Sequence, residues 1–347
     1  MLGIDRRTLQ AVWTLFLFAL VLLVIYNIGR TLIIFAVALI FAHLLAPVVN
    51  FVERLFPASV PRVASLALVY ILLIALMVAT FIPIGSRISQ EAATLTARLP
   101  EALKGDPLAN LPVPRWLEPF RPQITSYVHD WLADFGQTIG PKIAQAGTSL
   151  IRGIGSILGT ILIPILAFFF LKDGPLIRDA IVDSFEPRRR ELVDNIFSDV
   201  HMLLAQYIRA LVVLSLATFT FYAIFLAVIG GPYPVLLAGI AALLEFIPAV
   251  GPLAAGAAIV ITAAATGFGH ILIIVLFMAV YRIFQDYVLN PYLMSSGVEL
   301  HPLLVLFGVL AGEQLLGVPG MFFSVPAMAT LRLIIIRLRR RRPPLEA

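Results

Sequence analysis

Two short stretches in the last third of the chain place a carboxylate among prolines and glycines inside otherwise apolar sequence. The first is LEFIPAVGP at residues 244–252, and the second is GEQLLGVPG at residues 312–320. A charge in hydrocarbon and backbone groups freed by proline are both costly, so neither is expected in a simple membrane anchor. We therefore predict a functional site at each break. The candidate polar groups and the residues that shape the turns are Glu245, Glu313, Gln314, Pro248, Gly251, Pro252, Gly317, Pro319 and Gly320.

A polar stripe lies between the two breaks. Its members, at spacings that place them on one face of a helix, are Arg282, Gln285, Asp286 and Asn290. Arg282 lies deep within an apolar run, so the stripe needs polar partners. Two interpretations stay open. Arg282 and Asp286 form an internal pair packed against neighbouring helices, or the stripe and the two breaks line a wet cavity.

The charges of these residues suggest a coupling ion. If Glu245, Asp286 and Glu313 surround Arg282, three negative charges face one positive charge. A low dielectric disfavours this excess, and a proton or a sodium ion bound at Glu245 or Glu313 would relieve it. Each glutamate could instead be only a hydrogen-bond partner for exposed turn amides. His301 is predicted either to titrate at the base of this region or to start a helix.

The composition is that of an integral membrane protein. Hydrophobic residues make up 60% of the 347 residues and charged residues only 13%, against about 25% in soluble domains. Strand alternation is absent, so we predict an all-α polytopic fold with about eight membrane segments. The stretches without any charge, each close to or above the roughly 20 residues of a spanning helix, are residues 8–29, 31–52, 63–86, 153–171, 210–244 and 246–281.

Other classes of function find little support in the sequence. The basic residues flank the apolar runs, as the positive-inside rule places them, so we expect no nucleic-acid partner. There is no cysteine, no Walker A sequence, no HExxH and no GxSxG, and the five histidines are scattered. We therefore expect no enzyme activity, no cofactor and no metal other than the sodium ion considered above.

Charge and proline content divide the chain into six segments. A tight outer turn at residues 27–30 is predicted to join the first two spans, and Gly174 followed by Pro175 is predicted to end the fourth. Three crossings from a cytoplasmic N-terminus place the amphipathic insert outside. The segments are 1–84 with three spans, 85–150 as the extracytoplasmic insert, 151–171 as the fourth span, 172–204 as a cytoplasmic amphipathic segment, 205–336 as the transport core and 337–347 as a basic cytoplasmic tail.

Two architectures fit the last third of the chain. In one, residues 235–266, 269–290 and 303–336 are three long, kinked spans. In the other, the first and the last of these turn back at the breaks and leave on the side they entered. A straight helix over residues 235–266 would be about 48 Å long against a core of about 30 Å, so length favours the hairpins. Span plus hairpin would then occur twice as an inverted repeat, with both tips near the middle of the membrane.

The sequence resembles the AI-2E family of bacterial membrane proteins over nearly its whole length. The resemblance implies a transporter of the bacterial inner membrane, usually with eight membrane segments. The family takes its name from export of the quorum-sensing molecule autoinducer-2, and other members are described as sodium/proton antiporters. The most specific similarity lies in FFFLKDGP (168–175), GPYPVLLAGIAALLEFIPAVGP (231–252), QDYVLNPYLM (285–294), GVELHP (297–302) and GVPGMFFSVPAMATLR (317–332).

The family motifs also point to individual positions. Related proteins often have Asn where this chain has Glu245, so the resemblance gives the proline and glycine of that break more general weight than the charge. The motif positions present in this chain are Glu245, Pro248, Gly251, Pro252, Gln285, Pro291, His301, Pro302, Gly317, Pro319 and Gly320.

Residues and resemblance together predict a secondary transporter that exports a small polar solute such as autoinducer-2 across the lipid bilayer. Sodium ions or protons are the expected coupling partners, and the transport core would rock or slide relative to the first four spans. A sodium/proton antiporter is the first alternative. A non-transporting membrane scaffold is the second, although deep polar residues disfavour it. We expect both termini in the cytoplasm and a homo-oligomer.

Overall fold

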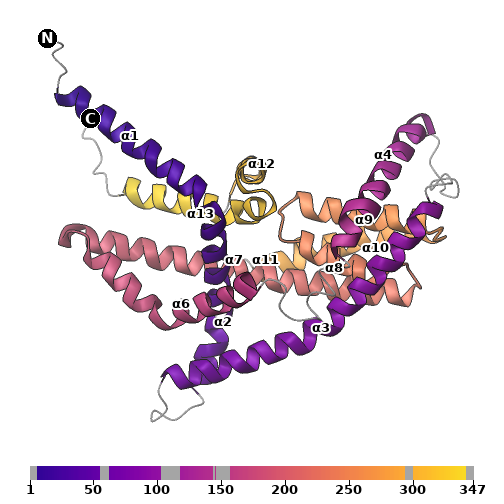
Figure 1. Cartoon of the computed structure of the whole chain (residues 1–347), viewed down its shortest axis with the longest axis horizontal. Helices are drawn as coiled ribbons and strands as arrows, with labels where there is room; N and C mark the ends of the chain where they lie inside the picture. Colours follow the sequence, from indigo (N-terminus) through magenta and orange to yellow (C-terminus); the bar gives the residue numbers. More distant parts are fainter. Residues whose placement is uncertain are drawn as a thin grey trace.

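The prediction of an all-α polytopic membrane protein is confirmed. The computed structural model describes residues 6–54, 62–102, 118–143, 145, 157–293 and 300–340, and these residues form helices and connections without a strand (Figure 1). The helices are α1 (Arg6–Asn27), α2 (Gly29–Glu53), α3 (Arg62–Ala102), η1 (Glu118–Phe120), α4 (Arg121–Asp134), η2 (Phe135–Ile139), α6 (Ile157–Asp183), α7 (Pro187–Val228), α8 (Pro234–Leu244), α9 (Val250–Ala265), α10 (Ile271–Phe284), η3 (Gln285–Leu289), α11 (Asn290–Leu293), α12 (Pro302–Leu316) and α13 (Val318–Arg340).

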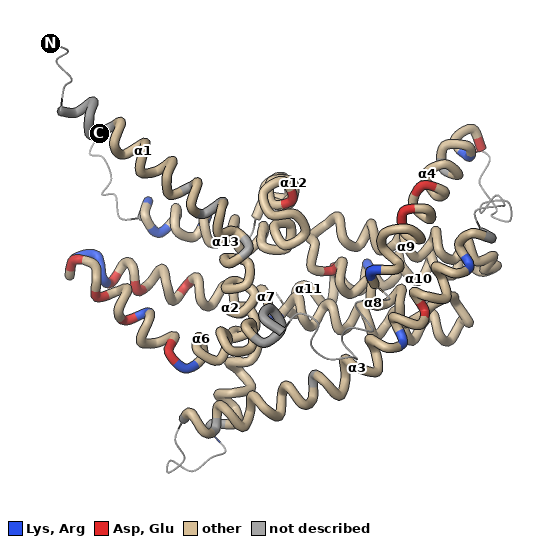
Figure 2. Tube along the Cα trace, in the orientation of Figure 1, with Lys and Arg blue, Asp and Glu red and all other residues tan. Residues whose placement is uncertain are grey.

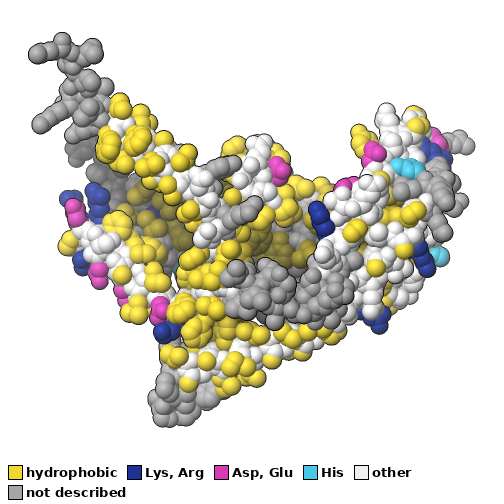
Figure 3. Space-filling model, in the orientation of Figure 1, with side chains coloured by type: hydrophobic (Ala, Val, Ile, Leu, Met, Phe, Trp, Pro, Cys, Tyr) yellow, Lys and Arg dark blue, Asp and Glu magenta, His cyan; other side chains and the backbone are white. Residues whose placement is uncertain are grey.

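The described helices have the lengths and surfaces of membrane segments. Five stretches are long and apolar enough to cross a bilayer, and shorter apolar helices accompany them. Apolar side chains cover much of the surface seen in Figure 3. Charged residues gather at the α6–α7 connection and around α3 and α4, while the helices between carry few (Figure 2). The five long stretches are Thr31–Val52, Leu66–Pro100, Pro187–Val228, Ile271–Leu293 and Val318–Arg339.

Three helices run further than the sequence predicted. The predicted helix stop at Gly174 and Pro175 is wrong, because α6 continues through both to Asp183. Its extension is held against α7 by an ion pair between Arg178 and Asp194. The predicted segment boundaries after residues 84, 171 and 204 fall inside α3, α6 and α7. None of these boundaries therefore marks the end of a helix. Each stays a prediction of where the chain leaves the membrane.

The junction between α1 and α2 also differs from its prediction. Helical hydrogen bonds continue through it, from Ile28 N to Val24 O at 2.9 Å and from Leu32 N to Ile28 O at 3.0 Å. Asn27 donates its side-chain amide to Leu23 O within its own helix. The predicted tight turn is wrong, because α2 continues away from α1 instead of folding back on it (Figure 1).

The buried apolar residues form three cores. One joins α2, the first half of α3 and α6, where the Tyr70 hydroxyl also donates to Pro164 O at 2.6 Å. The second joins α7, α8, α9 and α10 around Leu237 and Ile259. The third packs the last half of α3 and α4 against α8 and α9, around Leu95 and Leu236. Helix α3 therefore takes part in two separate cores.

Each predicted break is the turn of a pair of helices that pack on one another. Leu237, Ala241, Ala255 and Ile259 share one core, which places α9 antiparallel along α8. In the second pair, the first turns of α13 fold back along α12. A Cβ at Gly312 would meet the backbone of Gly320, and one at Gly308 would meet Ser324 and Met328. The last third therefore contains two helical hairpins, α8–α9 and α12–α13.

Candidate functional site

Glu245 lies in the turn of the α8–α9 hairpin, and its carboxylate faces two other elements. Its Oε2 accepts a hydrogen bond from the Thr218 hydroxyl of α7 at 3.2 Å. Its Oε1 accepts from the side-chain amide of Gln285, which begins η3 and is only 2% exposed. Glu245 itself is half-buried. The break thus places a carboxylate between α7 and η3, with neutral donors on both oxygens.

Hydroxyl groups of α7 extend this network. Thr218 and the Tyr281 hydroxyl of α10 lie 2.9 Å apart, and both residues are buried. One turn earlier on α7, the Ser215 hydroxyl donates to Ala242 O at 2.8 Å. Residues three apart share a helix face, so Ser215 and Thr218 both point at the end of α8. We call Glu245, Thr218, Tyr281 and Gln285 the Glu245 network.

The predicted polar stripe divides into two parts. Arg282 Nε lies 2.9 Å from Asp286 Oδ2, so the predicted internal pair is present, and Asn290 donates to the other oxygen of Asp286 at 3.2 Å. The side chains of Arg282 and Asp286 are 46% and 40% exposed. Gln285 turns instead towards Glu245, at the start of a π-helical turn that widens the helix there.

The charges of this region do not balance. Arg282 is paired with Asp286, and no Lys or Arg of the described residues lies within ion-pair distance of Glu245. Counting Glu245 and Asp286 as −1 each and Arg282 as +1 leaves one excess negative charge. A bound cation would neutralise it. No three His, Asp or Glu side chains of the described residues converge as a metal site.

The structure separates the second break from this network. Glu313 and Gln314 are exposed near the end of α12, and the network contains neither of them. His301 starts α12, because its Nδ1 accepts the Leu303 backbone N–H at 3.2 Å. The two hairpins do meet through Phe246 and Phe322, whose ring centroids are 5.4 Å apart. The turn of the α8–α9 hairpin therefore contacts α13, a few residues beyond the turn of the α12–α13 hairpin.

The glycines of the turns allow close backbone approach. A Cβ at Gly251 would overlap with the Leu244 carbonyl oxygen, and one at Gly320 would overlap with the Gly312 carbonyl. Gly317 has a positive φ of 65°, which suits glycine. Ala249 adopts φ 63° beside Pro248, a strained conformation for a residue with a Cβ. The predicted turn residues thus include positions that side chains cannot occupy without rearrangement.

Sequence reasoning missed Ser215, Thr218 and Tyr281. Hydroxyls in apolar helices often bond only to their own backbone, as Thr220 does with Leu216 O, so their presence in a span carries little information. The spacing of three between Ser215 and Thr218 was the available signal. Tyr281 adjoins Arg282 in the sequence, but Tyr281 is buried whereas Arg282 is exposed.

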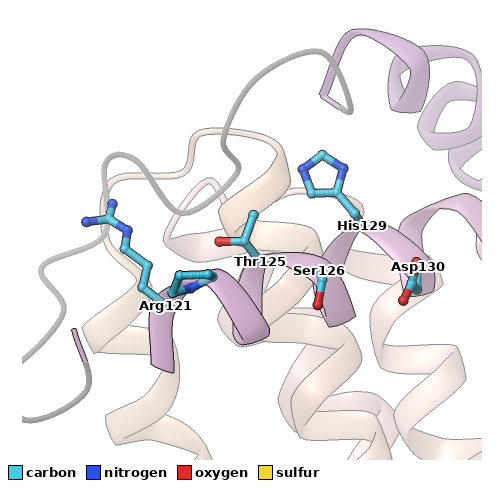
Figure 4. A pocket seen from close by; sticks show the side chains of 6 residues that line it. Arg121, Thr125, Ser126, His129 and Asp130 are labelled. Atoms are coloured by element: carbon cyan, nitrogen blue, oxygen red, sulfur yellow. The ribbon is translucent and has the colours of Figure 1, made fainter. Parts of the chain in front are cut away.

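A pocket of about 700 Å³ lies on α4, apart from the Glu245 network. Figure 4 shows its polar side chains along α4, and the described residues that line it all belong to this helix. Its lining residues are Arg121, Pro122, Thr125, Ser126, His129 and Asp130.

Comparison with known proteins places the chain among transport proteins. Residues 15–340 match the family model described as AI-2E family transporter. YrrI of Bacillus subtilis (strain 168), named as a transport protein, is 25% identical over 320 residues, which cover 88% of this chain and 86% of YrrI. YueF of the same organism, also named as a transport protein, is 24% identical over 343 residues, or 94% and 93% of the two chains. PerM of Escherichia coli (strain K12), named as a permease, is 26% identical over 211 residues and 57% of each chain.

Proposed function

Since the chain belongs to the AI-2E transporter family, we propose that it is a secondary transporter whose coupling cation binds at Glu245. The cation is a proton or a sodium ion, and the solute is small and polar. The observation that carries this proposal is the carboxylate of Glu245, which has neutral donors on both oxygens and no ion pair among the described residues. A cation entering there gains a charged ligand without first breaking a salt bridge.

The hairpins supply a route for the solute. We propose that both are re-entrant, so that their turns lie near the middle of the membrane, as in transporters built from inverted repeats. The contact between Phe246 and Phe322 supports a common depth for the two turns. The exposed pair of Arg282 and Asp286, with Asn290 beside it, would line the polar route that leads past Glu245.

The remaining parts of the proposal rest on the family resemblance and on charge. The protein would lie in the bacterial inner membrane with both termini in the cytoplasm, and residues 85–150 would lie outside. Export of autoinducer-2 is the first solute and direction to test. We propose a homo-oligomer because large apolar side chains are exposed over much of the surface. A second copy would cover part of this surface, and lipid would cover the rest.

Flux into proteoliposomes tests the proposal. Autoinducer-2, sodium ions and protons are followed with and without imposed sodium and proton gradients. We expect Glu245→Gln to reduce the effect of the gradient by about tenfold or more, because a neutral amide replaces a charged ligand. Glu191→Gln, the same change at an exposed position of α7, is the control and should match the wild type.

The outcomes separate the alternatives. Glu313→Gln should keep its gradient dependence, because Glu313 lies outside the Glu245 network. A loss of gradient dependence in this variant would instead support the prediction that both glutamates take part in cation binding. Cation exchange without solute flux would identify a sodium/proton antiporter. Unchanged coupling in Glu245→Gln would contradict a cation site there. Folded protein without any flux would favour the scaffold.

A further inference from the structure

Helix α8 begins with two backbone N–H groups that its own residues cannot satisfy. Tyr233 precedes it with φ 46° and makes no capping hydrogen bond with its side chain. Pro234 has no N–H, and the Leu237 N–H reaches Tyr233 O at 3.0 Å. The N–H groups of Val235 and Leu236 therefore need acceptors from elsewhere, and Leu236 is fully buried.

Glu91 of α3 supplies an acceptor for the buried one. Its Oε2 accepts the Leu236 N–H at an N···O distance of 2.7 Å. A carboxylate suits this position, because the first turn of a helix carries partial positive charge. Glu91 is 145 residues away from Leu236 in the sequence, so the contact joins two distant parts of the chain.

Packing on the same face of α3 fixes α8 further along its length. A Cβ at Gly239 would lie 3.0 Å from Cδ1 of Ile88, so α3 approaches the backbone of α8 closely. Leu95 and Leu236 share a buried core. Ile88, Glu91 and Leu95 follow at spacings of three and four, which place them on one face of α3.

We infer that Glu91 is a positioning residue for transport, because its cap on the first turn of α8 sets where Glu245 lies at the other end of that helix. The inference rests on the proposed function at Glu245. Helix α8 has 11 residues and is rigid over about 16 Å, so the direction of its first turn determines which part of α7 meets its last turn. The last half of α3 thus belongs with the transport machinery.

Cross-linking between the two hairpins measures this positioning without any solute. The chain has no native cysteine, so Phe246→Cys with Phe322→Cys introduces the only two thiols. In this background we expect Glu91→Leu to slow cross-linking by a short bifunctional thiol reagent about fivefold. This factor corresponds to the free energy that one helix cap contributes. Glu91→Gln keeps one acceptor oxygen, so the rate should fall only about twofold. Gln90→Leu, the same kind of change at an exposed neighbouring position, should not alter it.

Flux measurements in the cysteine-free chain complete the test. We expect Glu91→Leu to raise the KM for the coupling ion about fivefold, with the smaller effect in Glu91→Gln marking partial rescue. Equal cross-linking rates in Glu91→Leu, Gln90→Leu and the parent would overturn the inference. If Glu91→Leu does not fold, Glu91→Gln decides by the same comparison. If no variant shows flux but the cross-linking rates keep their expected order, the proposed function is wrong, whereas the positioning of α8 by Glu91 still holds.

Discussion

Glu245 receives its hydrogen bonds in a defined direction. The single proton of the Thr218 hydroxyl points to the carboxylate, so the neighbouring Tyr281 hydroxyl must donate to Thr218. Gln285 donates its amide to the other oxygen. If Glu245 takes up a proton, the new O–H can donate to Thr218, and the hydroxyl chain reverses. Protonation of Glu245 would therefore change the direction of both hydroxyl hydrogen bonds.

Loss of the Thr218 hydroxyl tests this chain of donors. Thr218→Val keeps the shape of the side chain but removes one donor to a charged group, which is worth about 1.5–3 kcal/mol. We expect the KM for the coupling ion to change about tenfold or more in proteoliposome assays. Thr220→Val is the matched control, because that hydroxyl is exposed and bonds only to its own helix. Equal effects of the two variants would contradict the network.

At the scale of elements, the turns of the two hairpins depend on glycines, which have no side chain. The sequence identified both breaks because Pro and Gly interrupt apolar runs, and each break is the turn between two packed helices. That these hairpins are re-entrant, as length suggests, stays a prediction. The same reasoning failed at Gly174 and Pro175, where α6 continues. A proline inside a helix removes one hydrogen bond, and tertiary contacts such as Arg178 with Asp194 hold the extension in place. Local sequence does not contain those contacts.

Alanine substitutions distinguish the glycines that are required from those that are tolerated. Gly251→Ala would drive a methyl group into the Leu244 carbonyl, and we expect a loss of stability of about 1–3 kcal/mol. A Cβ at Gly174 would meet nothing within 4 Å, so Gly174→Ala should increase the stability by about 0.5–1 kcal/mol, because glycine is costly inside a helix. Thermal unfolding in detergent measures both. A neutral Gly251→Ala would show that the turn relaxes more readily than its close packing implies.

At the scale of the whole molecule, two long helices join parts that the sequence had separated. Helix α3 packs against α2 and α6 through Leu66 and Val69, and against α8 through Leu95. Helix α7 contacts α2 through the pair of His201 and His43, whose nearest ring nitrogens are 2.9 Å apart, and it reaches α8 through Ser215, which donates to Ala242 O. The predicted division after residue 204 therefore does not separate two independent packing units.

Hydropathy gave the helical class and the apolar runs because burial in lipid acts on each segment alone. It could not give the partners of Glu245 or Glu91. Those contacts join residues 27 to 145 positions apart, and polar residues at such distances leave no periodic signal along the chain. The stripe at Arg282 was found because its members lie within one helix. Sequence patterns therefore predicted a site at this break, whereas the fold determines which residues contact Glu245.

The distribution of charge predicts which ends of the molecule face opposite sides of the membrane. Charged residues gather at the α6–α7 connection and around α3 and α4, and the helices between them carry few charges (Figure 2). Because the chain has no cysteine, Ser184→Cys in the connection and Ser126→Cys on α4 each introduce a single exposed thiol. In intact cells we expect a membrane-impermeant thiol reagent to label Ser126→Cys at least about tenfold faster, because a charged reagent crosses hydrocarbon slowly. Permeabilised cells provide the control, where both thiols should react at similar rates. Equal labelling in intact cells would place both ends on one side, which would contradict the placement of residues 85–150 outside and of residues 172–204 in the cytoplasm.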